Sequence, residues 1–360
     1  MSAEVRPPSS SARAVATERL AGLATPAGAL GRLGELAVWV AATQDQVPPA
    51  PLENVRAVIF AGDHGVTKPT TIQDGVTKPT TIQPGVSAYP REITGAMVHT
   101  FLLGRAGVSV LAAQHGVPVR VLDLGVDADL DVPAEVTAFK IRKGSGRIDV
   151  EDALTTDETL RAIAAGEAIA AEEIAAGAQL LISGDMGIGN TTPSAALVAA
   201  SLGLPAQEVT GLGTGVDEVA HAHKVQVVQA ALDRAGDRVA DPVDTLTALG
   251  SADLAASAGF MAAAARAGVP VLLDGVISVA AGLMADRLAP GAAAWFAAGH
   301  RSTEPALALA LDKLGLEPVL DLGMRLGEGS GAMAAVPIVR SAALLLRDVA
   351  LLADLLPDDA

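Results

Sequence analysis

Residues 184–193 read Gly-Asp-Met-Gly-Ile-Gly-Asn-Thr-Thr-Pro and combine three glycines with side chains that can bind an anion. They follow a strand-like run, Leu180–Ile182, and open a helix-like run that starts at Ser194. Glycine lets a backbone approach a ligand closely, and the free N–H groups of a helix N-terminus attract negative charge. Thr192 is the expected N-cap and Pro193 the expected first helical residue. A phosphate site is therefore favoured over a purely structural turn, with the expected binding residues Gly187, Gly189, Asn190, Thr191 and Thr192.

Glu328 stands between glycines in a second loop, residues 323–331, which leads into an apolar helix-like run. Taken alone, such a residue would be interpreted as a solvated surface carboxylate. Its place directly before a helix start instead favours a carboxylate that is aimed inward, where it can take a proton as a general base.

Two further segments can complete an anion site. Residues 299–305, Gly-His-Arg-Ser-Thr-Glu-Pro, follow a strand-like run, and Arg301 and Ser302 could bind the anion there. Plain helix capping explains the same residues equally well. A Gly-Leu-Gly-Thr-Gly segment centred on Gly213 lies upstream of Lys224, and both residues are also expected at the phosphate. The alternative for Lys224 is a solvated lysine on the surface of a helix.

Asp63 and His64 follow the first strand-like run, Val55–Ala61, and stand side by side in a Gly-Asp-His-Gly segment. They could be catalytic, although a simple strand-end turn accounts for them as well. Ser87 and Tyr89 come shortly afterwards, just before the expected start of the next helix. We expect these four side chains near one pocket.

The composition excludes several classes of function. The chain has no cysteine, which rules out disulfides, thiolate metal sites and cysteine nucleophiles. Its net charge is −16 and it has no run of basic residues, so nucleic acid and anionic membranes are poor partners. His221 and His223 are two apart on an expected helix and point to different faces, which argues against a metal pair. The N-terminus lacks the apolar stretch of a signal peptide, and charges interrupt Ser341–Leu356, so we expect a soluble cytoplasmic protein.

Strand-like runs alternate with alanine-rich helical runs along most of the 360 residues. Continuous apolar strands between helices predict an α/β fold, a doubly wound and mostly parallel sheet with helices on both faces. The site would then lie at the carboxyl ends of the strands. The expected strands are Val55–Ala61, Val108–Ala112, Val119–Leu124, Leu180–Ile182, Val269–Leu273 and Ala294–Phe296, and the expected helices include Leu160–Ala176 and Glu218–Ala235.

The expected domain organisation has three parts. Residues 1–14, rich in proline and serine, are expected to form a disordered tail. Residues 55–304 form the α/β phosphate-binding domain. Residues 15–54 and 305–360 together form a smaller, mainly helical domain.

Residues 65–74 and 75–84 repeat each other almost letter for letter, and residues 85–87 begin the unit a third time. A solenoid needs at least three stacked units, so this repeat does not build one. A duplication within an exposed, mobile surface loop is favoured, because lengthening a loop costs little entropy. A repeat with a ligand-binding role is the minor alternative.

Taken together, these segments resemble the nicotinate-nucleotide–dimethylbenzimidazole phosphoribosyltransferase family of cobalamin synthesis. Each motif alone is weak, but all occur in the family's order from about residue 25 almost to the C-terminus. The chain departs from the family at Thr25, Ala27 and Ala29, and more strongly in the duplicated segment 65–84. The matching segments are FAGDHGV (60–66), GVSAYP (85–90), GDMGIGNTTP (184–193), GLGTGVD (211–217), ALGSADLAA (248–256), VLLDG (271–275), GHRSTEP (299–305) and DLGMRLGEGSGA (321–332).

The resemblance implies transfer of the phosphoribosyl group of nicotinate mononucleotide to 5,6-dimethylbenzimidazole by a homodimer that needs neither a metal nor a cofactor. It makes Glu328 the general base and Asp185 a second catalytic carboxylate, and it places the pocket of Asp63, His64, Ser87 and Tyr89 at the acceptor. Two alternatives remain open: another phosphate-anchored transferase, or a non-catalytic nucleotide sensor. The carboxylate at position 328 favours an enzyme, because a sensor needs no base.

Overall fold

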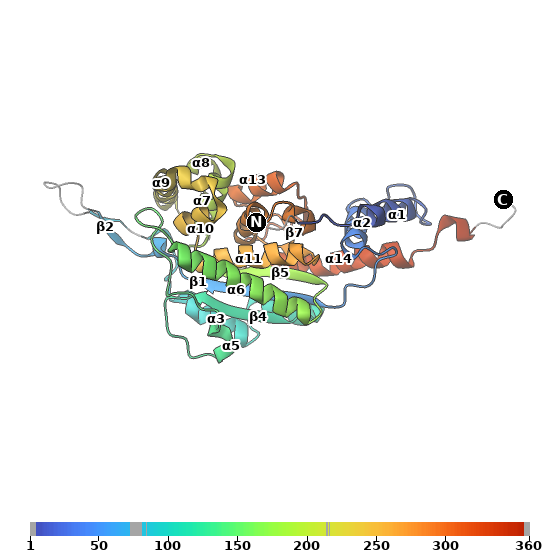
Figure 1. Cartoon of the computed structure of the whole chain (residues 1–360), viewed down its shortest axis with the longest axis horizontal. Coiled ribbons are helices and arrows are strands. Elements are labelled where there is room, and N and C mark those ends of the chain that lie inside the picture. Colours follow the sequence, from blue (N-terminus) through green and yellow to red (C-terminus); the bar gives the residue numbers. More distant parts are fainter. Residues whose placement is uncertain (1–4, 73–80, 84, 214, 216, 356–360) are drawn as a thin grey trace.

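The computed structural model describes residues 5–72, 81–83, 85–213, 215 and 217–355 (Figure 1). Its centre is a six-stranded sheet in the order β4-β1-β5-β6-β7-β8, and every neighbouring pair is parallel. The strands are β1 (Val55–Gly62), β4 (Val119–Gly125), β5 (Leu180–Met186), β6 (Val271–Leu273), β7 (Phe296–His300) and β8 (Pro318–Leu320). The expected α/β class is confirmed.

Helices cover both faces of the sheet, and the buried apolar residues of β1 alternate between the two faces. Val58 and Phe60 of β1 contact one helical layer, and Ala57 and Ile59 contact the other. The larger layer contains α6 (Thr156–Ala175), α7 (Thr191–Leu202), α8 (Ala206–Val209), α9 (Glu218–Ala235), α10 (Pro242–Leu249), α11 (Ala252–Arg266), α12 (Val276–Leu288) and α13 (Pro305–Leu314). The other layer contains α3 (Ile93–Leu102), α4 (Gly107–His115), α5 (Ala134–Thr137) and the first part of α14 (Ser330–Asp348). Four short 3-10 helices are Gly65–Thr67, Gly236–Ala240, Ala292–Trp295 and Leu352–Leu355.

The alanine- and glycine-rich composition allows helices to approach one another closely. A Cβ atom at Gly166 of α6 would lie 1.9 Å from the carbonyl oxygen of Ala256 in α11. A Cβ at Gly259 of α11 would lie 2.3 Å from the carbonyl oxygen of Ile163. Each helix therefore needs a glycine where the backbone of the other crosses it, and larger side chains would force the layer apart.

The second lobe is smaller than the sequence predicted. It consists of α1 (Ser10–Ala21), α2 (Arg32–Gln44) and the last part of α14, which share a separate apolar core that includes Leu36 and Leu346. Figure 1 shows α14 running from the sheet to this lobe. The expected boundary at residue 305 is wrong, because α13 packs against α7 and α12 and β8 is a strand of the main sheet.

The expected disordered tail is also too long. Helix α1 begins at Ser10, where the side chain of Ser9 accepts the N–H of Ala12 at 3.1 Å. Val5 is buried, and the carbonyl of Arg6 accepts the indole N–H of Trp295 at 2.8 Å. The serines that suggested disorder instead provide a helix cap. Residues 1–4 of the expected tail lie outside the described residues.

Two expected strands need correction. Val108–Ala112 lies within helix α4, because a short apolar run fits a buried helix as well as a strand. The strand expected at Ala294–Phe296 starts only at Phe296, after a 3-10 turn.

The duplicated segment contains an antiparallel ribbon rather than an irregular loop. Strand β2 (Thr70–Ile72) comes from the first copy and pairs with β3 (Thr81–Gln83) from the second. The base of the ribbon is closed by a hydrogen bond from the N–H of Val86 to the carbonyl of Val66, at 3.1 Å. The ribbon projects away from the sheet (Figure 1). Residues 73–80 and 84 of this segment lie outside the described residues.

Two helical stretches, 93–115 and 330–348, are long and apolar enough to cross a membrane by composition alone. The first is divided into α3 and α4, and the second is α14, which packs on α2, α4 and β7. Both stretches therefore take part in the packing of the fold.

Candidate active site

The carboxyl ends of four neighbouring strands bring buried ionisable side chains together. Asp63 and His64 follow β1, Asp185 lies near the end of β5, Asp274 follows β6 and His300 ends β7. In the sheet, β1 lies between β4 and β5, so the chain moves to one side of β1 and then to the other. The carboxyl ends of β1 and β5 therefore form a topological switch point, where α/β proteins bind ligands.

Helix α7 carries the predicted phosphate loop, but its cap differs from the prediction. The helix begins at Thr191 and its N-cap is Asn190, whose side chain does not cap it. The Asn190 amide instead donates to Oδ2 of Asp185 at 2.8 Å. Thr192 and Pro193 lie inside the first turn, and the buried Thr192 hydroxyl has no partner among the described residues. The loop therefore connects the helix start to the carboxylate of β5.

A small cavity of about 50 Å³ lies where the N-termini of α7 and α12 come together. Its residues come from five segments, four of which follow strands of the sheet, while the fifth is the loop after α8. The lining residues are Thr191, Gly213, Gly275, Val276, Ile277, His300, Ser302, Glu304, Arg325 and Gly327. Helix α12 has no side-chain cap, so its free N–H groups and those of α7 provide positive potential at the cavity.

Lys224 reaches this cavity from α9 and is buried, contrary to the solvated alternative. Its Nζ donates to Oγ1 of Thr191 at 2.8 Å and to the carbonyl of Gly211 at 3.1 Å. Burial lowers the pKa of Lys224, and the nearby negative charge of Glu304 opposes that effect. Glu304 also accepts the N–H of Gly213 at 2.8 Å. The lysine side chain is thus held against Thr191, which lines a cavity suited to an anion.

Asn190 and Thr192 do not line this cavity, and neither do Gly187, Gly189 and Arg301. A Cβ on Gly187 would lie 2.3 Å from the carbonyl oxygen of Gly62, and one on Gly189 would lie 2.5 Å from Cγ2 of Thr67. These glycines therefore allow the loop after β5 to pack on the loop after β1. Arg301 is exposed, and its Nε lies 3.4 Å from Asp321. By contrast, Thr191, Gly213 and Ser302 do line the cavity.

Glu328 is buried beside this cavity, next to the lining residue Gly327. Its φ of 66° is a left-handed conformation that is rare for a side chain other than glycine. Its Oε2 accepts the N–H of Val108, at the start of α4, at 3.3 Å. Burial raises the pKa of Glu328; the charge of Asp274 adds to this, and the Val108 N–H opposes it. A raised pKa suits a base that must accept a proton near neutral pH.

Asp185 lies on the other side of Gly327: a Cβ at that glycine would be 3.5 Å from its Oδ2. Burial raises the pKa of Asp185 well above its ordinary value, and the charges of Asp274, Asp253 and Glu328 raise it further. Only the Asn190 amide acts in the opposite direction. The surroundings of Asp185 therefore disfavour its charged form.

The four residues predicted for the acceptor pocket divide into two pairs. Asp63 and His64 are buried; one oxygen of Asp63 accepts the N–H of Asp127 at 2.8 Å, and the other has no partner in the described part of the chain. Nε2 of His64 lies 3.6 Å from Oδ2 of Asp253. Ser87 and Tyr89 lie at the surface, where the Ser87 hydroxyl accepts the N–H of Tyr89 and the tyrosine side chain is half exposed.

Sequence reasoning missed several residues of the site, among them Asp253, Asp274, Ile277, Glu304 and Arg325. Asp274 could have been predicted as a site residue, because its carboxylate directly follows an apolar strand. No local signal marked Ile277, which becomes a wall of the cavity only through the folding of α12.

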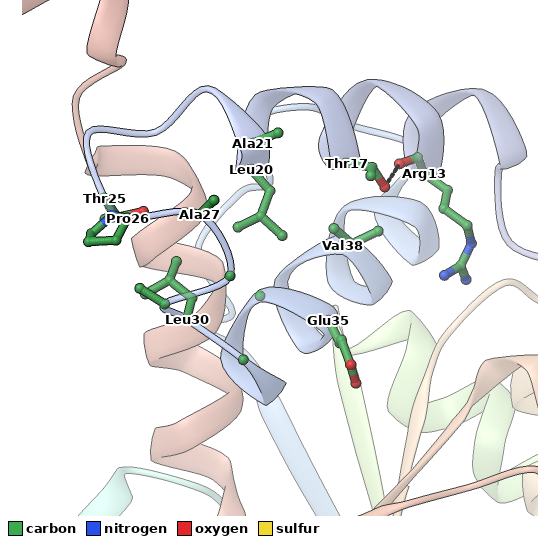
Figure 2. Close-up of a pocket in the computed structure, with 14 residues that line it drawn as sticks. Arg13, Thr17, Leu20, Ala21, Thr25, Pro26, Ala27, Leu30, Glu35 and Val38 are labelled. Carbon is green, nitrogen blue, oxygen red and sulfur yellow. Dashed lines mark hydrogen bonds between the residues drawn. The ribbon is translucent and has the colours of Figure 1, made fainter.

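A much larger cavity, of about 530 Å³, lies in the small lobe between α1 and α2 (Figure 2). Leu20, Ala27, Leu30 and Val38 line it together with only two charged side chains, Arg13 and Glu35. The buried carboxylates, the histidines and the helix N-termini all lie at the other end of α14. We therefore assign the chemistry to the smaller cavity. Among the described residues, no group of three or more His, Asp or Glu could hold a metal ion.

Comparison with known proteins gives a consistent result. The family model described as Phosphoribosyltransferase matches residues 5–354. The chain is 52% identical over 348 residues to the nicotinate-nucleotide–dimethylbenzimidazole phosphoribosyltransferase of Mycobacterium avium, covering 97% of this chain and 95% of that protein. It is 49% identical to the protein of the same name from Mycobacterium tuberculosis, covering 97% of this chain and 92% of that one.

The solved structures agree with the sequence comparison. The crystal structure of CobT from Thermus thermophilus superposes with a TM-score of 0.87 at 40% identity, covering 96% of this chain and 98% of that one. The matched region covers nearly the whole chain. The chain belongs to the nicotinate-nucleotide–dimethylbenzimidazole phosphoribosyltransferase family.

Proposed function

We propose that this chain transfers the phosphoribosyl group of nicotinate mononucleotide to 5,6-dimethylbenzimidazole, giving α-ribazole 5′-phosphate and nicotinate for the lower ligand of cobalamin. One observation carries the proposal: the buried carboxylate of Glu328, with a raised pKa, stands next to a cavity suited to a phosphate. The relatives described above bear the name of this reaction.

The reaction first needs a site that binds the phosphate and then a base that removes a proton. The N-termini of α7 and α12, with Lys224, hold the 5′-phosphate and so place the anomeric carbon. The pyridinium of nicotinate mononucleotide leaves with the electrons of its glycosidic bond and becomes neutral at nitrogen, so it needs no proton. A benzimidazole nitrogen attacks from the opposite face, which converts the β to the α configuration. Glu328 takes the proton from the other benzimidazole nitrogen.

Incubating the purified protein with both substrates tests the proposal. Chromatography should show nicotinate and α-ribazole 5′-phosphate appearing in equal amounts, and both should depend on dimethylbenzimidazole. Nicotinate released without the acceptor would indicate a hydrolase. Binding of nicotinate mononucleotide without any turnover would indicate the sensor alternative.

The proposal extends to assembly and location. We infer that the enzyme works as a homodimer in the cytoplasm, and the support is the family resemblance in its sequence motifs. Light scattering after size-exclusion chromatography should give twice the chain mass of 36.1 kDa. Cell fractionation should recover the activity in the soluble fraction. A monomeric mass would contradict the proposed dimer, and activity confined to membranes would contradict the proposed location.

A further inference from the structure

Asp274 is fully enclosed at the end of β6, and the mechanism above gives it no task. Its Oδ2 accepts the N–H of Gly329 at 3.0 Å, and its Oδ1 accepts the N–H of Ala332 at 2.8 Å. Both donors belong to the start of α14, whose N-cap, Gly329, has no side chain to cap it. A side chain from the neighbouring strand therefore provides the cap that the helix lacks.

The turn that these bonds hold is unusual. Gly327, Glu328 and Gly329 have φ values of 76°, 66° and 94°, so three consecutive residues are left-handed. Glycine adopts this conformation freely, but at Glu328 it costs on the order of 1 kcal/mol or more. Such a turn persists only where contacts outside it fix the conformation.

Three contacts fix Glu328. On one side its carbonyl oxygen lies against Gly184 of β5, where a Cβ would approach to 2.3 Å. On another side its carboxylate accepts the N–H of Val108. Downstream, the next peptide N–H is bound by Asp274. Of these three contacts, only that with Asp274 uses a charged side chain from outside the turn.

We propose that Asp274 is a positioning residue, which aims the Glu328 carboxylate at the acceptor by binding the backbone N–H groups of Gly329 and Ala332. The inference rests on the proposed function of Glu328 as the general base. A base that is displaced by about 1 Å loses on the order of 10²-fold in rate, although the substrates still bind.

The charge of Asp274 has a second, measurable effect. Burial and this charge both raise the pKa of Glu328, so neutralising Asp274 must lower it. The other ionisable groups that face this turn are Asp185 on β5, Asp253 at the start of α11, and His300 on β7, whose Nε2 lies 3.6 Å from Oδ1 of Asp274. Arg325 lies on the same loop as Glu328. The pKa of Asp185 is itself raised well above its ordinary value by burial and by the charges of Asp274, Asp253 and Glu328.

The experiment compares Asp274→Asn with the wild-type enzyme, with Asp274→Ser as a second variant of smaller volume. The kcat is measured against pH at saturating substrates, together with KM for each substrate. We expect kcat to fall about 10²-fold, the KM for nicotinate mononucleotide to change little, and the acid limb of the profile to move to lower pH. The direction follows because a base works only above its pKa, and that pKa falls in the variant.

Asp123→Asn is the matched control. Asp123 is equally enclosed in β4 and accepts a backbone N–H, that of Val126, at 2.8 Å, but it does not contact the Glu328 turn. The acid limb of the kcat profile of Asp123→Asn should lie at the same pH as in the wild type. An Asp274→Asn enzyme with wild-type kcat and an unmoved limb would overturn the proposal, and so would failure of both Asp274 variants to fold.

The outcomes separate this inference from the proposed function. A wild-type protein that makes no α-ribazole 5′-phosphate refutes the proposed function and, with it, the positioning role of Asp274. A fully active Glu328→Gln enzyme refutes the base. If both tests support the proposed function, the Asp274 profile alone decides the inference.

Discussion

Glu328 shows how a single residue can be both strained and useful. Its left-handed backbone is costly, yet this conformation turns the carboxylate toward α4 and away from solvent. Glu328→Gln keeps the shape and loses the proton acceptor, so we expect kcat to fall by about 10²–10⁴, the usual contribution of a general base. Steady-state kinetics measures this fall in kcat. A kcat near the wild-type value with unchanged product would refute the assignment of Glu328 as the general base.

The pH dependence of the wild-type enzyme follows from the same residue. Burial raises the pKa of Glu328, and a general base must be ionised to act. Activity should therefore disappear on the acid side at a higher pH than for a solvent-exposed glutamate. A kcat profile in which this limb is the same in wild type and Glu328→Gln would contradict the prediction.

Lys224 is the second residue whose role can be isolated. Lys224→Met removes a cation that contacts Thr191, and a lost charge-assisted hydrogen bond costs about 1.5–3 kcal/mol. The affinity for nicotinate mononucleotide should fall roughly 10- to 100-fold, with little change for dimethylbenzimidazole, as measured by calorimetry. Lys313→Met, on the exposed side of α13, is the control. Equal losses for both ligands would place Lys224 outside the phosphate site.

At the scale of elements, Gly187 belongs to the contact between two loops. We predicted from the sequence that it approaches the phosphate, but a side chain there would meet Gly62 and His64. Gly187→Val should therefore lower the free energy of unfolding by about 1–3 kcal/mol, as overpacking does, besides any effect on binding. Gly22→Ala, whose Cβ would find ordinary contacts, is the control in denaturant titrations. Wild-type stability in Gly187→Val would show that the contact can relax.

For the duplicated segment we predict almost no loss of stability, in contrast to Gly187→Val. Deleting residues 75–84 removes β3 but leaves Val66 and Val86, which close the base of the ribbon. Because halving a loop changes its closure entropy by only about 0.6 kcal/mol, stability should change by less than about 1 kcal/mol. Thermal melting and KM for dimethylbenzimidazole test this, and we expect activity to be kept or improved. Unfolding, or loss of phosphate binding, would make the repeat structural.

These elements also show what the sequence could and could not predict. Periodicity identified β1, β4, β5, α6 and α9, because their patterns are long or bounded by clear turns. It failed for 108–112, where four apolar residues in a run of five do not distinguish a helix from a strand. Glu328 was found through its glycine neighbours, whereas the burial of Lys224 depends on the distant loop of Gly211. Contacts between remote segments leave no periodic signal, so the packing of Gly187 on Gly62 could not be predicted, and its approach to the phosphate stays a prediction.

For the whole molecule, the chemistry proposed above makes a metal unnecessary, because the leaving pyridinium already carries the positive charge. Treatment with EDTA followed by gel filtration should leave kcat unchanged. Activity that vanishes with EDTA and returns with Mg²⁺ or Zn²⁺ would contradict this mechanism. The control is the same treatment of a Mg²⁺-dependent phosphoribosyltransferase, which should lose its activity.

The ribbon closed by Val66 and Val86 also has a genetic consequence. The two copies of the repeat are nearly identical in amino-acid sequence. We expect the DNA that encodes them to be nearly identical as well, and such a direct repeat is prone to slippage during replication. Each gain or loss of a copy keeps the reading frame and restores the same closing pair of valines. Strains of one species should therefore differ here by complete units, while the segments that form the catalytic cavity keep a constant length.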